Sequence, residues 1–267
     1  DWDGDGDKDL ICGSFLDHVT FFENVGTRQA PQFAEGRRLK HGGEPIRMDL
    51  EMLRVTACDW DADGDTDLIV GQEDGRVALL ECRGFDRKAG TPAFEPPVFF
   101  QQQARRLKVG VLNTPSSVDW DGDGDTDLIC GDSAGYLHFV ENLGGGDPPR
   151  FALPQLLKAG GEVVRIQAGE NGSIQGPAEA KWGYTVPAAS DFDGDGLPDI
   201  VINSIWGEIL WYRNLGSRRE PKLAAAQRVE VDWQGAPPQP AWNWWKPEGN
   251  SLVTQWRTSP VLFDVNR

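Results

Sequence analysis

Four aspartate-rich segments of nearly identical sequence constrain the fold of this chain more than any other feature. They read DWDGDGDKDLICG (1–13), DWDADGDTDLIVG (59–71), DWDGDGDTDLICG (119–131) and DFDGDGLPDIVIN (191–203), and a fifth start follows at Asp264. Internal repeats with a period of roughly 60 to 70 residues are typical of propellers, solenoids and other repeat architectures. Each Asp-rich segment is therefore expected to occupy the equivalent place in one repeated structural unit.

The rest of each repeat predicts β-strands. Each Asp-rich loop runs into an apolar stretch, and a second stretch follows at VTFFENVG (19–26), VALLECRG (77–84), LHFVENLG (137–144) and ILWYRNLG (209–216). Runs of this length that are rich in β-branched and aromatic residues and end at glycine favour strands. Small-residue strands precede the later loops, in RVTACDW, PSSVDW, VPAASDF and SPVLFDV, and fourth strands are expected near 30–40, 96–108 and 148–158, with 219–231 a poorer match. No segment has sustained helical periodicity.

Four strands per repeat predict an all-β fold, a β-propeller of four-stranded blades. The pattern D-x-D-G-D-G-x-x-D-L, followed by a strand and F-x-N-x-G, resembles the FG-GAP or VCBS repeats that form the blades of integrin-α-like propellers. The resemblance covers essentially the whole chain. It implies a single β-propeller region over 1–267, with repeats that start near 1, 59, 119 and 191 and a partial repeat from 264.

The number of blades stays open at this point. In the first alternative, the four blades represented here are one arc of a larger ring, because members of this group usually form seven-bladed rings. In the second alternative, the small-residue segment 258–265 supplies the strand that the first repeat lacks and closes a four-bladed ring.

The Asp-rich loops have the composition of calcium sites. Aspartates at loop positions 1, 3, 5 and 9, with glycine at position 6, supply the hard oxygen ligands that calcium prefers, and position 7 would give its backbone carbonyl. The alternative is a plain Asp-Gly turn; four copies of the same carboxylates favour calcium, as about four structural ions. The expected ligands are Asp1, Asp3, Asp5, Asp7, Asp9, Asp59, Asp61, Asp63, Asp65, Asp67, Asp119, Asp121, Asp123, Asp125, Asp127, Asp191, Asp193, Asp195, Leu197 and Asp199.

Charge and composition limit the partners. The formal net charge is -16, with 42 acidic against 26 basic residues, and 16 of the acids fill the four ligand positions of the four loops. An acidic balance argues against nucleic acid as a partner. There is no stretch of 18 apolar residues, so no membrane span is predicted. Cys12, Cys58, Cys82 and Cys130 follow no zinc spacing; buried free thiols are expected, and the disulfide state stays open.

The chain opens within a motif, without a signal peptide or an initiator methionine. We therefore expect a portion of a longer protein that is secreted, or located at the cell surface or in the periplasm.

Function is expected on the rim opposite the Asp-rich loops, because the long, aromatic-rich connections 158–185 and 232–258 fall there. The candidate catalytic residues are Tyr184, Arg257, Lys181, His18 and Arg54, and the candidate ligand-binding residues are Trp206, Trp256, Trp182, Asn113 and Tyr136. Trp242, Trp244 and Trp245 either stack on a ligand or fill a small core within their own loop.

Three functions fit this arrangement. The first is a calcium-stabilised binding module for carbohydrate or protein. The second is a lyase or glycosidase that acts on uronic-acid-containing polysaccharide, in which a cation neutralises the carboxylate and a base removes the adjacent proton. The third is a structural arc of a larger ring. The sequence therefore leaves open whether the protein is an enzyme, what it binds and its oligomeric state.

Overall fold

The computed structural model describes residues 1–102, 106–145, 149–236 and 249–262. Trp242, Trp244, Trp245 and the fifth repeat start at Asp264 lie outside the described residues. Within those ranges the regular structure is almost entirely β, and the helical content is one short 3-10 turn, η1 (Pro177–Glu179). The described part of the chain has no helix that is long and apolar enough to cross a membrane.

Four antiparallel sheets correspond to the four repeats, and we call them the first to fourth repeat sheets. The first contains β1 (Leu10–Gly13), β2 (Val19–Phe22) and β3 (Arg37–Arg38). The second contains β6 (Arg54–Cys58), β7 (Asp67–Gly71), β8 (Val77–Leu80) and β11 (Val98–Phe99). The third contains β13 (Thr114–Val118), β14 (Asp127–Gly131), β15 (Leu137–Val140) and β17 (Gln155–Leu156). The fourth contains β20 (Pro187–Ser190), β21 (Asp199–Asn203), β22 (Ile209–Tyr212) and β23 (Gln227–Arg228).

Shorter strands lie in the connections between the repeat sheets. One small sheet has the order β5-β4-β10-β9, from β4 (Lys40–His41), β5 (Glu44–Pro45), β9 (Cys82–Asp86) and β10 (Thr91–Phe94). Two further pairs are β12 (Gln101–Gln102) with β16 (Arg150–Phe151) and β18 (Lys158–Ala159) with β19 (Glu162–Val163).

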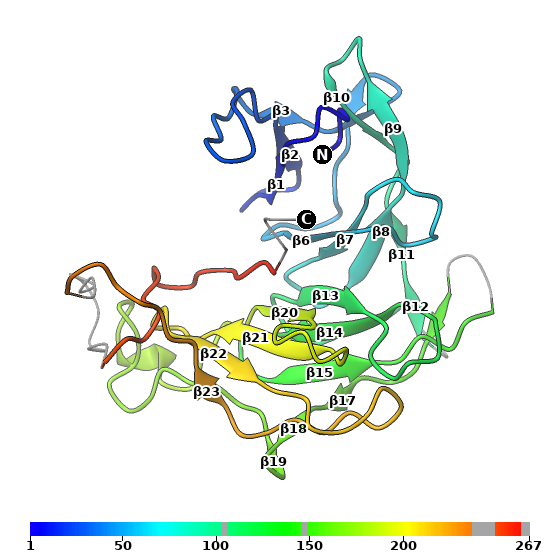
Figure 1. Ribbon diagram of the computed structural model, residues 1–267. Coiled ribbons are helices and arrows are strands. Elements are labelled where there is room, and N and C mark those ends of the chain that lie inside the picture. The colour runs from blue at the N-terminus through cyan, green and yellow to red at the C-terminus, as the bar shows by residue number, and fades with distance from the viewer. Residues whose placement is uncertain (103–105, 146–148, 237–248, 263–267) are drawn as a thin grey trace.

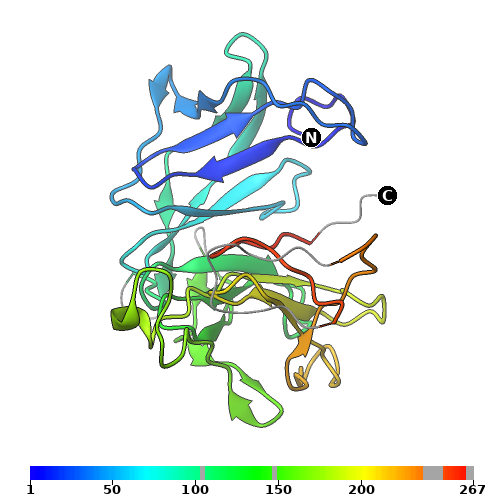
Figure 2. The same cartoon turned by 90° about the vertical axis from the view of Figure 1, so that its left-hand side faces the viewer.

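The repeat sheets follow one another in chain order, from blue to yellow in Figure 1, and β13 lies between β6 and β20. From the fourth sheet, the red C-terminal segment runs back toward β6 (Figures 1 and 2). Successive four-stranded sheets packed in this manner, with almost no helix, are consistent with a β-propeller-like fold.

The core consists of three hydrophobic clusters, each between successive sheets. Along β7, Leu68 and Val70 face the first sheet whereas Ile69 faces the third. The same alternation occurs on β14, where Leu128 faces the second sheet and Ile129 the fourth. Side chains of a strand point alternately to the two faces of its sheet. The continuous apolar runs of the sequence are therefore explained by strands that are buried on both faces.

A glycine at the end of each of β1, β7 and β14 allows neighbouring sheets to approach closely. A Cβ atom would lie less than 3.0 Å from a backbone oxygen of the next repeat, namely that of Leu53 for Gly13, of Asn113 for Gly71 and of Thr185 for Gly131. At the equivalent place in the fourth sheet, β21 ends at Asn203. Its side chain accepts a hydrogen bond from the Val186 amide and donates one to the Tyr184 carbonyl.

The expected all-β fold and the strand order within a repeat are confirmed. The segment 219–231, which fits the fourth-strand pattern less well than the others, also contributes a fourth strand, β23. The first repeat sheet has three strands, and residues 258–262 form no strand. Residues 263–265, the rest of the proposed closing segment, lie outside the described residues.

The four cysteines are free thiols. The expectation that they are buried is confirmed for Cys82 and Cys130, whereas Cys58 is half-buried. It is wrong for Cys12, which is exposed on β1 because one face of the first sheet is open. Cys130 is fully buried between the second and third sheets, and this burial raises the pKa of its thiol to about 12. A thiol with so high a pKa is a poor nucleophile at neutral pH.

Candidate functional site

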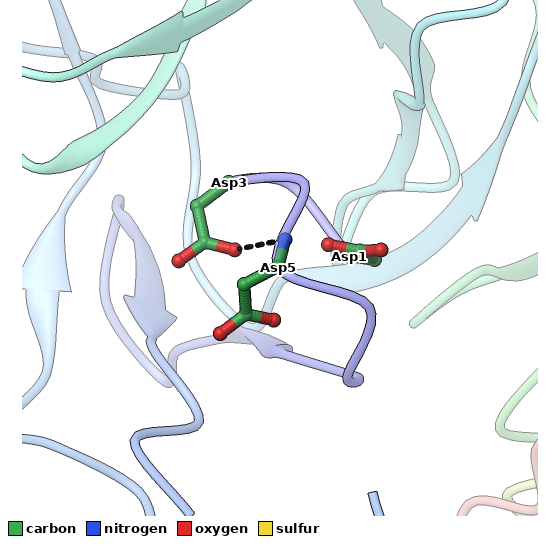
Figure 3. Close-up of side chains that lie close together, drawn as sticks. All are labelled: Asp1, Asp3 and Asp5. Atoms are coloured by element: carbon green, nitrogen blue, oxygen red, sulfur yellow. Dashed lines mark hydrogen bonds between the residues drawn. The ribbon is translucent and has the colours of Figure 1, made fainter. Parts of the chain in front are cut away.

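Each Asp-rich loop brings carboxylates together into a group that could hold a cation. In every loop, three aspartates place one oxygen each within 4.8 Å of the other two: Asp1, Asp3 and Asp5; Asp59, Asp61 and Asp67; Asp119, Asp121 and Asp127; Asp191, Asp193 and Asp195. Figure 3 shows the first group, in which the Asp3 carboxylate also accepts a hydrogen bond from the Asp5 amide at 3.1 Å. The second, third and fourth loops join the first strand of their sheet to the second, so they lie at equivalent ends of the sheets.

Side-chain to backbone hydrogen bonds hold the shape of each loop. In the first loop, Asp1 accepts from the Gly6 amide at 3.1 Å and Asp5 from the Asp7 amide at 3.0 Å. Such bonds are expected in a plain Asp-Gly turn, and they are also compatible with a calcium-binding loop. The glycine at position 6 has φ between 88° and 98° in all four loops, whereas position 4 has a lower positive φ and accommodates Ala62 at 60°. Glycine is thus needed more at position 6 than at position 4.

The aspartate at loop position 9 has a second role that the sequence did not predict. Asp127 is fully buried, its Oδ1 accepts from the Asn142 amide at 2.8 Å and its Oδ2 accepts from the Trp120 amide at 3.0 Å. The same Oδ1 bond recurs from Asp9 to the amide of Asn24, from Asp67 to that of Cys82 and from Asp199 to that of Asn214. Position 9 therefore ties each loop to the residue two positions after β2, β8, β15 or β22 of its own sheet.

The electrostatics of the loops fit a bound cation. Burial, strengthened by repulsion from Asp121 and Asp123, raises the pKa of Asp127 to about 7, although the Asn142 and Trp120 amides act in the opposite direction. Burial also raises the pKa of Asp67 and of Asp199. Two carboxylate oxygens of the loops, Asp7 Oδ1 and Asp199 Oδ2, are buried without a well-formed hydrogen bond, although the Asn24 and Trp211 side chains lie close enough to act against the burial that raises the pKa of Asp7 and of Asp199, respectively. A buried carboxylate oxygen without a donor is costly unless a cation compensates it.

A hollow of about 580 Å³ lies between the second and third loops. Its lining includes Asp59, Asp61, Asp67, Glu81 and Asp125. This acidic hollow belongs to the loops themselves, since its charged lining consists of their aspartates and of Glu81, which directly follows β8.

A second pocket, of about 250 Å³, opens at the opposite ends of the strands. Its lining is Gly13, Ser14, Phe15, Met52, Leu53, Arg54, Leu112, Thr114, Tyr184 and Val186. Because Arg54 begins β6 and Thr114 begins β13, the pocket lies at the rim away from the Asp-rich loops. We call this the inner-strand pocket. Of the candidate residues of the sequence, it brings Arg54 and Tyr184 together.

The backbone around this pocket repeats an unfavourable conformation. Met52, Leu112, Tyr184 and Arg257 have φ of 56°, 54°, 48° and 55°, and each stands at the same place ahead of an Asp-rich motif. A residue other than glycine pays roughly 1 kcal/mol or more in this left-handed region. The recurrence ahead of β6, β13 and β20 indicates that the packing of these inner strands imposes this conformation, and Arg257 adopts it without a strand in 258–262.

Arg257 is held in a cluster beside the pocket. Its guanidinium carbon lies 3.3 Å from the ring centroid of Tyr184 and 4.1 Å from that of Trp256. Its Nη2 donates to Glu179 Oε1 at 2.7 Å, and the Tyr184 hydroxyl donates to the same oxygen at 2.9 Å. Trp182 stacks on Tyr184 with centroids 5.4 Å apart. Sequence analysis did not identify Glu179, which joins Arg257 to Tyr184.

The other candidates lie apart from this pocket or are engaged elsewhere. Asn113 is fully buried and its amide donates to the Val109 carbonyl, so it is a core residue. Trp206 donates from Nε1 to the Ala168 carbonyl, and the Arg165 guanidinium lies over the Tyr136 ring. His18 lies 3.6 Å from Asp17. Lys181 is exposed, and neither it nor His18 lines the pocket.

The comparison with known families agrees with the first repeat. Residues 1–70 match a family model described as an FG-GAP-like repeat. The chain contains an FG-GAP-like repeat. The matched span runs from the first Asp-rich loop through the first repeat sheet to β7, so it includes two of the four Asp-rich loops. No curated protein matches the chain.

Proposed function

We propose that this chain is a calcium-stabilised, β-propeller-like binding module that binds a carboxylate-bearing carbohydrate at the inner-strand pocket. It acts outside the cytoplasm, as a secreted or surface-located part. The observation that carries the proposal is an arginine without an acidic partner, Arg54, at the mouth of a pocket with an apolar lining.

Calcium serves as the structural component in this proposal. The donor set of every loop is made of carboxylate oxygens within 4.8 Å of one another, which is the hard-oxygen environment that calcium prefers. The buried oxygens of Asp7 and Asp199, which lack a well-formed hydrogen bond, provide the independent support. About four ions would neutralise the loops and, through the position 9 aspartates, reinforce each sheet.

Arg54 is suited to bind a carboxylate. The residue as a whole is exposed, but partial burial of its guanidinium lowers its pKa, and the positive charge of the nearby Arg257 lowers it further. Within the described ranges no carboxylate acts on Arg54, whereas Arg257 is paired with Glu179 and Arg76 with Asp74. An unpaired guanidinium beside a second one attracts an anion, and the planar fork of arginine matches a carboxylate.

The apolar lining favours a sugar ring next to that carboxylate. Phe15, which is 71% exposed, and Tyr184 both line the pocket. Aromatic rings beside charged groups are well suited to stack on a sugar while the charged group fixes its orientation. An acidic sugar unit presents both features in one residue.

Binding is favoured over elimination as the activity of this pocket. Burial and the Glu179 carboxylate raise the pKa of Tyr184 to about 12, and its hydroxyl already donates to Glu179. A general base must accept a proton near neutral pH. Tyr184 stays protonated there, so the pocket offers a cation and aromatic surface and lacks a poised base at this position.

The test compares binding of polygalacturonate, a neutral glucan and a poly-glutamate peptide by isothermal titration calorimetry. Polygalacturonate is expected to bind, and Arg54→Ala to weaken it about 10- to 100-fold, the effect of one charge-assisted hydrogen bond. Arg87→Ala removes an exposed charge from the turn between β9 and β10 and serves as the control. Equal affinities of the two variants would overturn the assignment of Arg54. Binding of the peptide alone would make the ligand a protein.

A further inference from the structure

The fourth Asp-rich loop differs from the other three in one charge that faces it. In the first three repeats a glutamate directly follows β2, β8 and β15, namely Glu23, Glu81 and Glu141. In the fourth repeat the equivalent residue, just before Asn214, is Arg213. The fourth loop also carries Leu197 where the others carry a fifth aspartate.

Arg213 binds the carboxylates that would hold the cation. Its Nη2 lies 2.6 Å from Asp193 Oδ2 and 3.2 Å from Asp195 Oδ2. Both aspartates belong, with Asp191, to the group whose oxygens lie within 4.8 Å of one another. The guanidinium therefore neutralises two of the three clustered carboxylates directly.

No other loop has this arrangement among the described residues. At the first and second loops, the equivalent glutamates pair with Arg37 and Arg83. Arg83 is near enough to Asp61 to interact with it electrostatically, but its ion pairs are with Glu81 and Glu95 and not with a clustered aspartate. At the third loop, Arg218 donates to the backbone carbonyl of Asp119, and its contact is not with a carboxylate. Each of the first three repeats thus gathers six carboxylates at its loop, whereas the fourth gathers four carboxylates and one guanidinium.

We propose that Arg213 makes the fourth loop the weakest of the four calcium sites. This inference rests on the calcium part of the proposed function. A divalent cation must displace Arg213 from Asp193 and Asp195, and it then stays close to a positive charge where the other loops have a negative one. The site is weakened and not abolished, because Arg213 pairs with two of the three clustered carboxylates, and the buried Asp199 Oδ2 beside them lacks a well-formed hydrogen bond.

The expected difference is about tenfold or more in affinity. Even in bulk water, two unit charges at contact distance change an equilibrium constant about fivefold, and the change is larger where solvent is partly excluded. The cation is divalent, and the replacement of glutamate by arginine changes the neighbouring charge by two units. A tenfold weaker calcium affinity is therefore the lower end of the expected effect. Calcium titration should therefore resolve three tighter sites and one weaker site.

Two reciprocal variants test the inference on the full chain. Arg213→Glu is expected to convert the weak site into a fourth tight one, and Glu141→Arg to leave two tight and two weak sites. Arg219→Glu makes the same charge change at an exposed position six residues after Arg213 along the same connection and is the matched control. Asp193→Asn should remove only the weak class, which assigns that class to the fourth loop.

Stoichiometry is measured by equilibrium dialysis and calorimetry, with circular dichroism to verify folding. Arg213→Gln replaces Arg213→Glu if the latter does not fold. Four equivalent sites in the wild type, or equal effects of Arg213→Glu and Arg219→Glu, would overturn the role of Arg213 while leaving calcium binding intact. A protein that binds no calcium would overturn the calcium part of the proposed function.

Discussion

Replacing Asp127 by asparagine tests whether loop position 9 couples calcium to the third sheet. The carboxylate is fully buried and accepts from the Asn142 amide at 2.8 Å and the Trp120 amide at 3.0 Å. Asparagine keeps one acceptor but presents an NH₂ group to the second amide. The loss of one charge-assisted hydrogen bond costs roughly 1.5–3 kcal/mol, and a stranded buried donor adds about 1–3 kcal/mol before relaxation. We expect the free energy of unfolding in saturating calcium to fall by about 3 kcal/mol.

The assay is thermal unfolding followed by circular dichroism. For a chain of this size a loss of about 3 kcal/mol corresponds to a decrease in Tm of roughly 6–12 °C. Asp86→Asn is the control, because Asp86 is exposed at the end of β9 and lies outside the Asp-rich loops. Its Oδ1 accepts from the Lys88 and Ala89 amides at 2.9 and 3.1 Å, and asparagine can accept the same bonds. We expect this control to change the free energy of unfolding by less than about 1 kcal/mol.

Chelation separates the two roles of Asp127. Each ion that binds only the native state stabilises it by about 2.7 kcal/mol at 100 times its Kd, so excess EGTA should lower the Tm of the wild type strongly. Without the cation, burial raises the pKa of Asp127 to about 7 and makes its charged form costly. Asparagine is neutral and avoids this cost, so the difference in Tm between wild type and Asp127→Asn should be smaller in EGTA than in calcium. If this difference in Tm is the same in EGTA and in calcium, or if the control lowers the Tm as much as Asp127→Asn does, the coupling of calcium to the third sheet is refuted. A wild-type Tm that EGTA leaves unchanged would refute the calcium sites.

Two further predictions concern the sheets. Gly131→Ala is expected to destabilise the protein by about 3 kcal/mol in urea unfolding, because a Cβ would overlap the Thr185 carbonyl oxygen; a loss below about 1 kcal/mol would show that the sheets shift freely. Burial, with a contribution from Glu208, raises the pKa of Tyr212 to about 12. Its contribution to stability is complete below the unfolded pKa near 10 and is lost as the pH rises toward 12, about 1 kcal/mol by pH 11. Tyr212→Phe should lack this part of the alkaline decline, and identical declines of the two proteins between pH 9 and 11 would contradict the assignment.

The regular part of the fold could be predicted because its signals are local. Strands such as β7 and β14 are apolar, short and preceded by the same loop, so spacing alone placed them. The carboxylate groups could be predicted for the same reason, since each lies within nine consecutive residues. Gly71 and Gly131 carried a packing signal in their identical position, although the partner atoms lie in the next repeat.

The rest depends on contacts between segments that are far apart in the chain. Arg257 meets Glu179 and Tyr184 only because the C-terminal segment returns across the sheets. Asn113, predicted as a ligand residue, is buried instead. A comparison of the repeats could have revealed this, because Asn113 stands at the same place as Leu53, an apolar residue that is also buried.

The asparagine at the end of β21 has a consequence for how the array can continue. Between the first and fourth sheets, each step is possible because a glycine leaves room for a backbone oxygen of the next repeat. In the fourth sheet Asn203 stands at the equivalent position, and its side chain bonds to Val186 and Tyr184, just ahead of β20 in the same sheet. A further sheet that packed on this end of β21 would therefore meet a side chain that already has hydrogen-bond partners, where the earlier sheets meet a glycine.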